Sequence, residues 1–136
     1  MWIVGNSVIN LWVKKMSDTC NSFYLKAYRI HIYVDTLRAI GSPNRICFML
    51  DNDFKNLAII PYNKRDFKSH SVSDGVYNGS HCLEISSFPL CQLLMKRYNW
   101  DYNHSYRIIG RVGSINNGQK AVIFRLEEAN QINNIQ

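Results

Sequence analysis

The residues best suited to nucleophilic chemistry form two adjacent pairs, His81 with Cys82 and His104 with Ser105. Nucleophilic catalysis needs a Cys or Ser whose proton passes to a nearby His that an acidic group orients. Neighbouring residues of a strand point to opposite faces, so His81 and Cys82 would not meet. We therefore expect that the chain is not an enzyme, and we assign no catalytic residue.

A zinc site is the other chemistry that these residue types allow. Its four candidate ligands match no recognised spacing of ligand pairs: they are Cys20, His70, His81 and Cys82. We expect no metal and no other cofactor. The four cysteines of the chain include no C-x-x-C pair. They are typical of a reducing compartment, which favours the cytoplasm.

Positive charge is the strongest functional signal of the composition. Sixteen Lys and Arg residues stand against ten Asp and Glu, a net charge of +6, and such an excess favours contact with polyanions. A cluster of basic residues interleaved with aromatic ones, which suits phosphate contacts with some base stacking, falls in one segment: Tyr62, Lys64, Arg65, Phe67, Lys68 and His70.

Four further basic residues fall on predicted strands, where alternation could bring them to one solvent face. They are Lys26, Arg29, Arg107 and Arg111. Together with Lys64, Arg65 and Lys68 they form the predicted nucleic-acid site, with double-stranded DNA as the candidate ligand. The alternative for each residue is an ordinary solvated surface charge.

Residues 23–34 alternate between two faces and predict one half-buried strand. One face would carry Tyr28, Ile30, Ile32 and Val34, and the other Arg29, His31 and Tyr33. Asp35 then stands as the N-cap of a two-turn helix that ends at Gly41. Two apolar runs flank the turn formers of residues 51–56 and predict a hairpin. Residues 23–62 therefore form a βαββ unit.

Residues 63–81 lack apolar periodicity and predict a basic linker loop, and residues 82–126 predict a second unit. A strand at 82–86 leads to a helix capped by Ser86 or Ser87, with Pro89 in its first turn. Strands at 106–115 and 120–126 flank an Asn-Gly turn, which is a strong hairpin signal. Residues 127–136 form a polar tail.

The same order of elements therefore occurs twice, in an α+β fold of two βαββ pseudo-repeats that share one core. We expect a mostly antiparallel sheet and two helices, although a chance order of elements is the alternative. The apolar stripes of the helices should be buried: they comprise Leu37, Ile40, Leu90, Leu94 and Tyr98.

Residues 1–22 are expected to form an N-terminal appendage. Their apolar run is too short to span a bilayer, and the basic pair Lys14 and Lys15 follows it, which is the reverse of a secretory signal. We expect no membrane contact. Either the segment docks on the core or a partner, through Trp2, Leu11 and Trp12, or it precedes a natural start at Met16.

The segment from Arg29 to Pro61 resembles the swapped-hairpin unit of the AbrB and MraZ family of bacterial DNA-binding regulators. The residues that carry the resemblance are Arg29, Ile30, Leu37, Arg38, Gly41, Leu57 and Pro61. Two positions depart from the pattern: Val34 and Asp35 replace a Pro before the helix, and Asn44 and Arg45 replace a Gly-Asp pair. The chain is also similar to small proteins of Gram-positive bacteria and mobile elements, and in outline to the βαββ saddle of TATA-binding proteins.

The resemblance and the charge favour a small DNA-binding or regulatory module that contacts mainly the phosphate backbone. The alternative is a non-catalytic protein-interaction or assembly module of a bacterial mobile element. In that case the N-terminal appendage would bind a partner or form a homodimer. The salt dependence of DNA binding separates the two hypotheses, because phosphate contacts release counterions.

Overall fold

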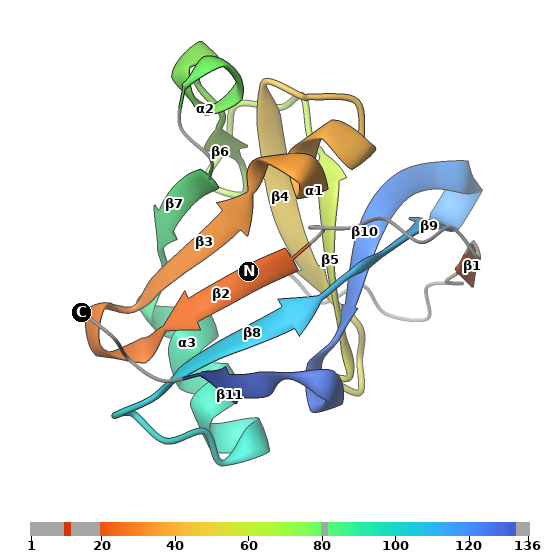
Figure 1. Ribbon diagram of the computed structural model, residues 1–136. Helices are drawn as coiled ribbons and strands as arrows, with labels where there is room; N and C mark the ends of the chain where they lie inside the picture. The colour runs from red at the N-terminus through yellow and green to blue at the C-terminus, as the bar shows by residue number, and fades with distance from the viewer. Residues whose placement is uncertain (1–9, 12–19, 80–81, 133–136) are drawn as a thin grey trace.

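The computed structural model describes residues 10–11, 20–79 and 82–132, which form two antiparallel sheets (Figure 1). Sheet A has the order β1 (Asn10–Leu11), β9 (Arg111–Ile115), β10 (Gln119–Arg125), β5 (Asn56–Pro61), β4 (Arg45–Leu50) and β6 (His70–Ser71). Sheet B has the order β11 (Asn130–Ile132), β8 (Ser105–Ile109), β2 (Cys20–Tyr24), β3 (Arg29–Tyr33) and β7 (Cys82–Ser86). This arrangement confirms a mixed α+β fold with antiparallel pairing.

The three helices are α1 (Val34–Ala39), α2 (Asp74–Asn78) and α3 (Phe88–Tyr98). The main core lies between the sheets, and α1 and α3 close opposite ends of it (Figure 1). Of the five helix residues predicted to be buried, Leu37, Leu90 and Leu94 are fully buried and Ile40 is nearly so. Tyr98 is half-buried, and its hydroxyl donates a hydrogen bond to the carbonyl of Phe54.

The N-cap predicted for α3 at Ser87 is confirmed, whereas the N-cap predicted for α1 at Asp35 is wrong, because the residue at that position is Tyr33. The Ser87 hydroxyl accepts a hydrogen bond from the Leu90 amide at 3.4 Å, and Pro89 lies in the first turn of α3. Helix α1 begins one residue before Asp35, which therefore lies in the first turn. Gly41 follows α1 with a φ of +93°, a conformation that glycine adopts without strain.

The predicted single strand at residues 23–34 is wrong, because it is a hairpin of β2 and β3. The chain reverses at the 3₁₀ turn Leu25–Ala27 and at Tyr28, which has a φ of +52°. The strands then pair with Phe23 opposite Ile30. Alternation could not reveal this turn, since it contains no Gly, Pro or Asn. Lys26 consequently lies in a turn and Val34 in α1, although Arg29, His31 and Tyr33 do share the predicted solvent face.

The predicted strand at residues 106–115 is also two strands. It breaks at Gly110, so that β8 pairs with β2 in sheet B while β9 pairs with β10 in sheet A. A Cβ atom at Gly110 would lie 2.5 Å from Val122 Cγ1 and 2.7 Å from Phe124 Cε1. Only glycine leaves room for the backbone to cross this close to the core.

The segment expected to be a linker loop, residues 63–81, contains β6 and α2. Val72 and Val76 from this segment are buried in the main core, and the Tyr77 hydroxyl donates a hydrogen bond to the Pro43 carbonyl at 2.5 Å. Two isolated valines among polar residues produce no periodicity, which is why the prediction missed them. The loop of residues 62–69, between β5 and β6, keeps the expected irregular form.

The predicted limits of the N-terminal appendage and of the polar tail both differ from the limits of the strands. Residues 20–22 of the predicted appendage belong to β2, which lies between β8 and β3. Residues 130–132 of the predicted tail form β11, whose Asn130 lies opposite Arg107. Residues 20–22 and 130–132 therefore belong to sheet B, whereas residues 10–11 of the predicted appendage form β1 in sheet A.

The superposition of the two predicted βαββ units on each other stays a prediction. The elements β3, α1, β4 and β5 are followed later by β7, α3, β9 and β10, with β8 inserted. In the part of the chain described, no helix is long and apolar enough to cross a membrane.

Replacement of Gly110 by Ala should destabilise the fold by about 1–3 kcal/mol, because the new methyl group would overlap buried Val122 and Phe124. Urea unfolding followed by circular dichroism measures the change. Gly75→Ala is the matched control, since its Cβ would meet nothing closer than Ser73 Oγ at 3.7 Å. Equal stability of the two variants would contradict the close approach at Gly110.

Candidate nucleic-acid interface

The outward side of sheet B carries polar and aromatic side chains, because alternation turns Ile30 and Ile32 inward to the core. The strand register places one residue from each of the five strands in a row: Glu84, His31, Ser22, Arg107 and Asn130. We call this side the polar face. We define it by ten residues: Ser22, Tyr24, Lys26, Arg29, His31, Tyr33, Cys82, Glu84, Ser105 and Arg107.

A depression of about 630 Å³ opens at the end of the polar face where the turn Leu25–Ala27 joins β2 and β3. The side chains of Tyr24, Lys26 and Arg29 contribute to its lining, together with His31, Glu84, Asn103 and Ser105. Its lining combines two full cations with one carboxylate. Such a concave, polar surface can accept a charged group.

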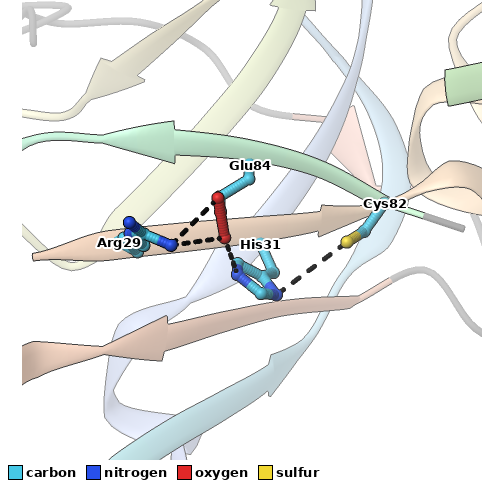
Figure 2. A network of polar contacts seen from close by, with 4 residues as sticks. All are labelled: Arg29, His31, Cys82 and Glu84. Atoms are coloured by element: carbon cyan, nitrogen blue, oxygen red, sulfur yellow. Dashed lines mark hydrogen bonds and ion pairs between the residues drawn. The ribbon is translucent and has the colours of Figure 1, made fainter. Parts of the chain in front are cut away.

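Glu84 organises one side of the depression (Figure 2). Both of its carboxylate oxygens lie 3.2 Å from Arg29 Nη1, and His31 Nε2 lies 2.9 Å from its Oε1. The hydrogen bond with His31, followed by the charge of Arg29, lowers the pKa of Glu84. The carboxylate therefore stays ionised at neutral pH and fixes the orientation of both partners.

Cys82 completes a Cys–His–Glu series on β3 and β7 (Figure 2). Its Sγ lies 3.8 Å from Nδ1 of His31, whose other ring nitrogen contacts Glu84. Burial, followed by the charge of Glu84, raises the pKa of the Cys82 thiol. A nucleophilic cysteine needs a lowered pKa. The three residues therefore follow the order of a Cys–His–acid catalytic triad, but the pKa of the thiol is raised instead of lowered.

Sequence reasoning missed this series because His31 and Cys82 are far apart in the chain. Their contact arises only from the pairing of β3 with β7, in which Tyr33 lies opposite Cys82 and His31 opposite Glu84. His81 lies outside the described residues, and His104 Nε2 is 3.4 Å from Asp101. The expectation that the chain is not an enzyme stays a prediction.

Three of the predicted basic residues lie on the polar face: Lys26 and Arg29 line the depression, and Arg107 lies opposite Ser22. Arg107 Nε donates a hydrogen bond to Ser22 Oγ at 3.2 Å, and its guanidinium carbon lies 5.7 Å from the centre of the Tyr33 ring. In the described part of the chain, neither Lys26 nor Arg107 has a carboxylate within ion-pair distance. Both cations are therefore available to an external anion.

The aromatic rings of the polar face lie beside these cations. Tyr24 stacks obliquely against His31, with ring centres 4.5 Å apart. Tyr24 and Tyr33 are both half-buried, so part of each ring meets solvent. By contrast, the aromatic residues Phe48, Trp100 and Phe124 are buried.

The other predicted basic residues lie elsewhere. Arg111 belongs to sheet A, and its Nη1 lies 3.2 Å from Glu128 Oε1. Lys64, Arg65 and Lys68 belong to the 62–69 loop, which precedes β6 and α2 at the top of Figure 1, whereas the turn between β2 and β3 lies at the lower left. The structure thus separates the predicted site into at least two surfaces.

The 62–69 loop is held by hydrogen bonds to Asp66. One carboxylate oxygen accepts a bond from the Lys68 amide at 2.8 Å, and the other accepts one from the Tyr62 hydroxyl at 2.9 Å. Lys64 and Arg65 are exposed, and the Phe67 side chain is 85% exposed. The loop therefore presents charge and an aromatic ring, but apart from the polar face.

The remaining candidate residues are dispersed. Cys20 and Cys82 belong to sheet B and His70 to sheet A, and the described residues include no group of three or more His, Cys, Asp or Glu suited to a metal ion. Of the predicted partner contacts, Leu11 lies in β1 opposite Gly113. Trp2 and Trp12 lie outside the described residues.

Comparison with protein-family models, with curated proteins and with solved structures found no match.

Replacement of Glu84 by Gln should make Cys82 more reactive, because it removes a negative charge that raises the pKa of the thiol. The alkylation rate of Cys82 by iodoacetamide, followed by peptide mass spectrometry across a pH series, should shift to lower pH. Glu127→Gln is the control, as an exposed carboxylate in the 3₁₀ turn Leu126–Glu128. Identical pH profiles for Glu84→Gln and the parent chain would refute the coupling.

Proposed function

We propose that the chain is a small nucleic-acid-binding module that contacts phosphates through the polar face of sheet B. The observation that carries the proposal is that Lys26 and Arg29 line one depression of the polar face, while Arg107 lies on the same face, opposite Ser22. The only carboxylate among the residues that define the polar face is Glu84, and it lies against Arg29 and His31. The polar face therefore keeps a positive excess.

Arg107 is the residue best prepared for a phosphate. Its Nε is engaged by Ser22 and its guanidinium carbon lies near the ring of Tyr33, so the group is oriented before any ligand arrives. A planar guanidinium can donate paired hydrogen bonds to phosphate oxygens. Lys26 supplies a more mobile point charge at the depression.

The spacing of the cations suits a chain-like polyanion. Arg107 on β8 and Arg29 on β3 are separated by β2 alone, which corresponds to about 10 Å between their strands. A single run of phosphates can therefore approach both. The exposed parts of Tyr24 and Tyr33 would add sequence-tolerant stacking wherever bases are unpaired, so we expect little preference for sequence.

We also propose that the two βαββ units are related by a pseudo-twofold axis, as the resemblance to duplicated or swapped-hairpin DNA-binding folds implies. Two features support it: sheet A contains the order β9-β10-β5-β4, and β3 pairs with β7 in sheet B. Strands β2 and β8 have no counterpart in such a scheme. Superposition of residues 29–62 on residues 82–126 tests it, and unrelated strand directions would contradict it.

The alternative is a protein-interaction or assembly module. The observation that favours it is a second apolar cluster on sheet A, separate from the main core, which includes Cys47, Ile60 and Ile123. A chain of that kind would bind no DNA even at low salt, whereas phosphate binding is strongest there.

The double variant Lys26→Glu with Arg107→Glu should weaken binding to two unrelated DNA duplexes to a similar extent, because phosphate contacts carry no sequence information. The slope of log affinity against log salt should become shallower by about 2, since each lost phosphate contact contributes roughly 0.9. Fluorescence anisotropy of labelled duplexes, with a labelled single strand in parallel, measures both quantities.

The matched control is Lys55→Glu with Lys96→Glu, which makes the same change in charge at exposed residues of the β4–β5 turn and α3. It should retain most of the affinity and the salt slope of the parent chain. Equal losses in the two double variants would show that only net charge matters. Absence of binding by the parent chain at low salt would favour the interaction module.

Reversal of charge at Lys64, Arg65 and Lys68 tests the loop that the sequence singled out. We expect this triple variant to change the salt slope less than the Lys26 and Arg107 double variant does, although it removes more positive charge. The reason is that the loop lies away from the polar face, in the connection between β5 and β6. A larger loss in the triple variant would place the DNA site on the loop.

A further inference from the structure

Three aromatic side chains form a group beside the depression of the polar face. Phe88 is 55% exposed and Tyr102 is 42% exposed. Tyr28 contacts both, because its ring centre lies 4.7 Å from that of Phe88 and 6.3 Å from that of Tyr102. We call Tyr28, Phe88 and Tyr102 the aromatic rim. Single exposed apolar residues are ordinary, whereas a contiguous exposed group indicates an interaction site.

Hydrogen bonds hold the three segments of the aromatic rim together. The Ser87 amide donates to the Tyr28 carbonyl at 2.9 Å, which joins the start of α3 to the turn between β2 and β3. The Tyr102 hydroxyl donates to the Lys26 carbonyl at 3.3 Å, which joins the loop before β8 to the same turn. In Figure 1 that turn and the start of β8 both lie at the lower left. The rings are therefore positioned before a ligand arrives, which lowers the entropy cost of binding.

The backbone of Tyr28 shows that its ring is fixed in place. Its φ is +52°, a conformation in which glycine or asparagine is usual and a bulky side chain is rare. Such a residue keeps this conformation only where its surroundings hold it, and the ring of Tyr28 does pack against the main core. Phe88 packs on this ring at an interplanar angle of 65°. Tyr28 is thus a rigid support for the more exposed Phe88.

The aromatic rim adjoins the depression through the backbone. Tyr28 lies in the chain between Ala27 and Arg29, and Tyr102 directly precedes Asn103. Ala27, Arg29 and Asn103 all belong to the lining of the depression. A ligand that occupies the depression can therefore extend onto the rings.

The carboxylates near the aromatic rim are engaged within the protein. Glu84 contacts Arg29 and His31, as described above. Asp101, which precedes Tyr102, accepts a hydrogen bond from the Asn103 amide at 2.9 Å, and its other oxygen lies 3.4 Å from His104 Nε2. Lys26 has no carboxylate within ion-pair distance in the described part of the chain. A ligand at the rim therefore meets an available cation beside exposed rings.

We propose that the preferred ligand of the polar face is a single-stranded nucleic acid, an inference that rests on the phosphate-binding function proposed above. Its unpaired bases would stack on Phe88 and Tyr102 while its phosphates contact the cations of the polar face. A single strand offers flat rings and negative charges in alternation, which is the chemistry that this surface complements. In a duplex the bases are stacked on one another, so only the phosphates can be contacted. Single strands should therefore bind more tightly than the double-stranded DNA that the sequence suggested.

Three labelled probes of equal length separate stacking from phosphate contacts: an oligothymidine strand, an abasic strand and a duplex. Phe88→Ala should weaken the binding of oligothymidine about tenfold, because the variant loses one stacked base. The same variant should bind the abasic strand and the duplex almost as the parent chain does, since neither offers an unpaired base. Fluorescence anisotropy at a fixed low salt concentration measures all three affinities. The parent chain should prefer oligothymidine to the abasic strand, and Phe88→Ala should remove most of that preference.

The matched control is Phe67→Ala, which removes the same ring from an 85% exposed position in the 62–69 loop. It should leave the affinity for oligothymidine unchanged. Phe88→Tyr should retain binding and Phe88→Leu should not, because leucine keeps an apolar side chain without a ring. Phe88 is the first residue of α3, where alanine fits a helix well. Circular dichroism checks the fold, and Tyr102→Ala replaces any variant at Phe88 that does not fold.

Selective loss of oligothymidine binding in Phe88→Ala supports the proposal. Equal affinity of the parent chain for oligothymidine and the abasic strand would overturn it and leave the phosphate-binding function intact. A larger loss in Phe67→Ala than in Phe88→Ala would also overturn it, because stacking would then occur on the loop. If the parent chain binds none of the three probes, the phosphate-binding function itself fails, and a dimer in sedimentation that Phe88→Ala dissociates would assign the aromatic rim to a contact between copies.

Discussion

The close approach of the backbone at Gly110 to Val122 and Phe124 is the constraint on which the two-sheet arrangement depends. It lets the chain leave sheet B at the end of β8 and enter sheet A at the start of β9 without a loop. The two sheets are thereby joined by covalent chain at the place where their core side chains meet. The main core can then include residues of both sheets, and α1 and α3 close its ends.

The pairing of β3 with β7 has a comparable role for the polar face. It places Glu84 opposite His31 and within reach of Arg29, and the resulting contacts hold both side chains beside the depression (Figure 2). Cys82 lies near the same histidine, yet burial and the nearby carboxylate keep it a thiol. The Cys82 thiol therefore lacks the lowered pKa that a nucleophilic cysteine needs.

The two sheets use their outward sides differently. Sheet B presents cations, hydroxyls and half-buried rings, which suit a solvated polyanion. Sheet A is apolar on both sides, as its two separate clusters show. The apolar side chains of sheet A therefore serve packing, whereas the outward side of sheet B carries the charged groups.

Local patterns in the sequence were sufficient for the features that depend on neighbouring residues. Alternation correctly placed Ile30 and Ile32 inside and Arg29 and His31 outside, and Ser87 was correctly identified as the cap of α3. The breaks at Tyr28 and Gly110 were missed, because a turn without turn-forming residues and a strand that changes sheets keep the periodicity of one continuous strand. The tertiary structure alone decided that His31 contacts Cys82 and Glu84. It also decided that Arg29 and Arg107 share a face of sheet B, whereas Arg111 belongs to sheet A. The physical reason is that strand partners are chosen by long-range packing of the core, about which the period of a single strand carries no information.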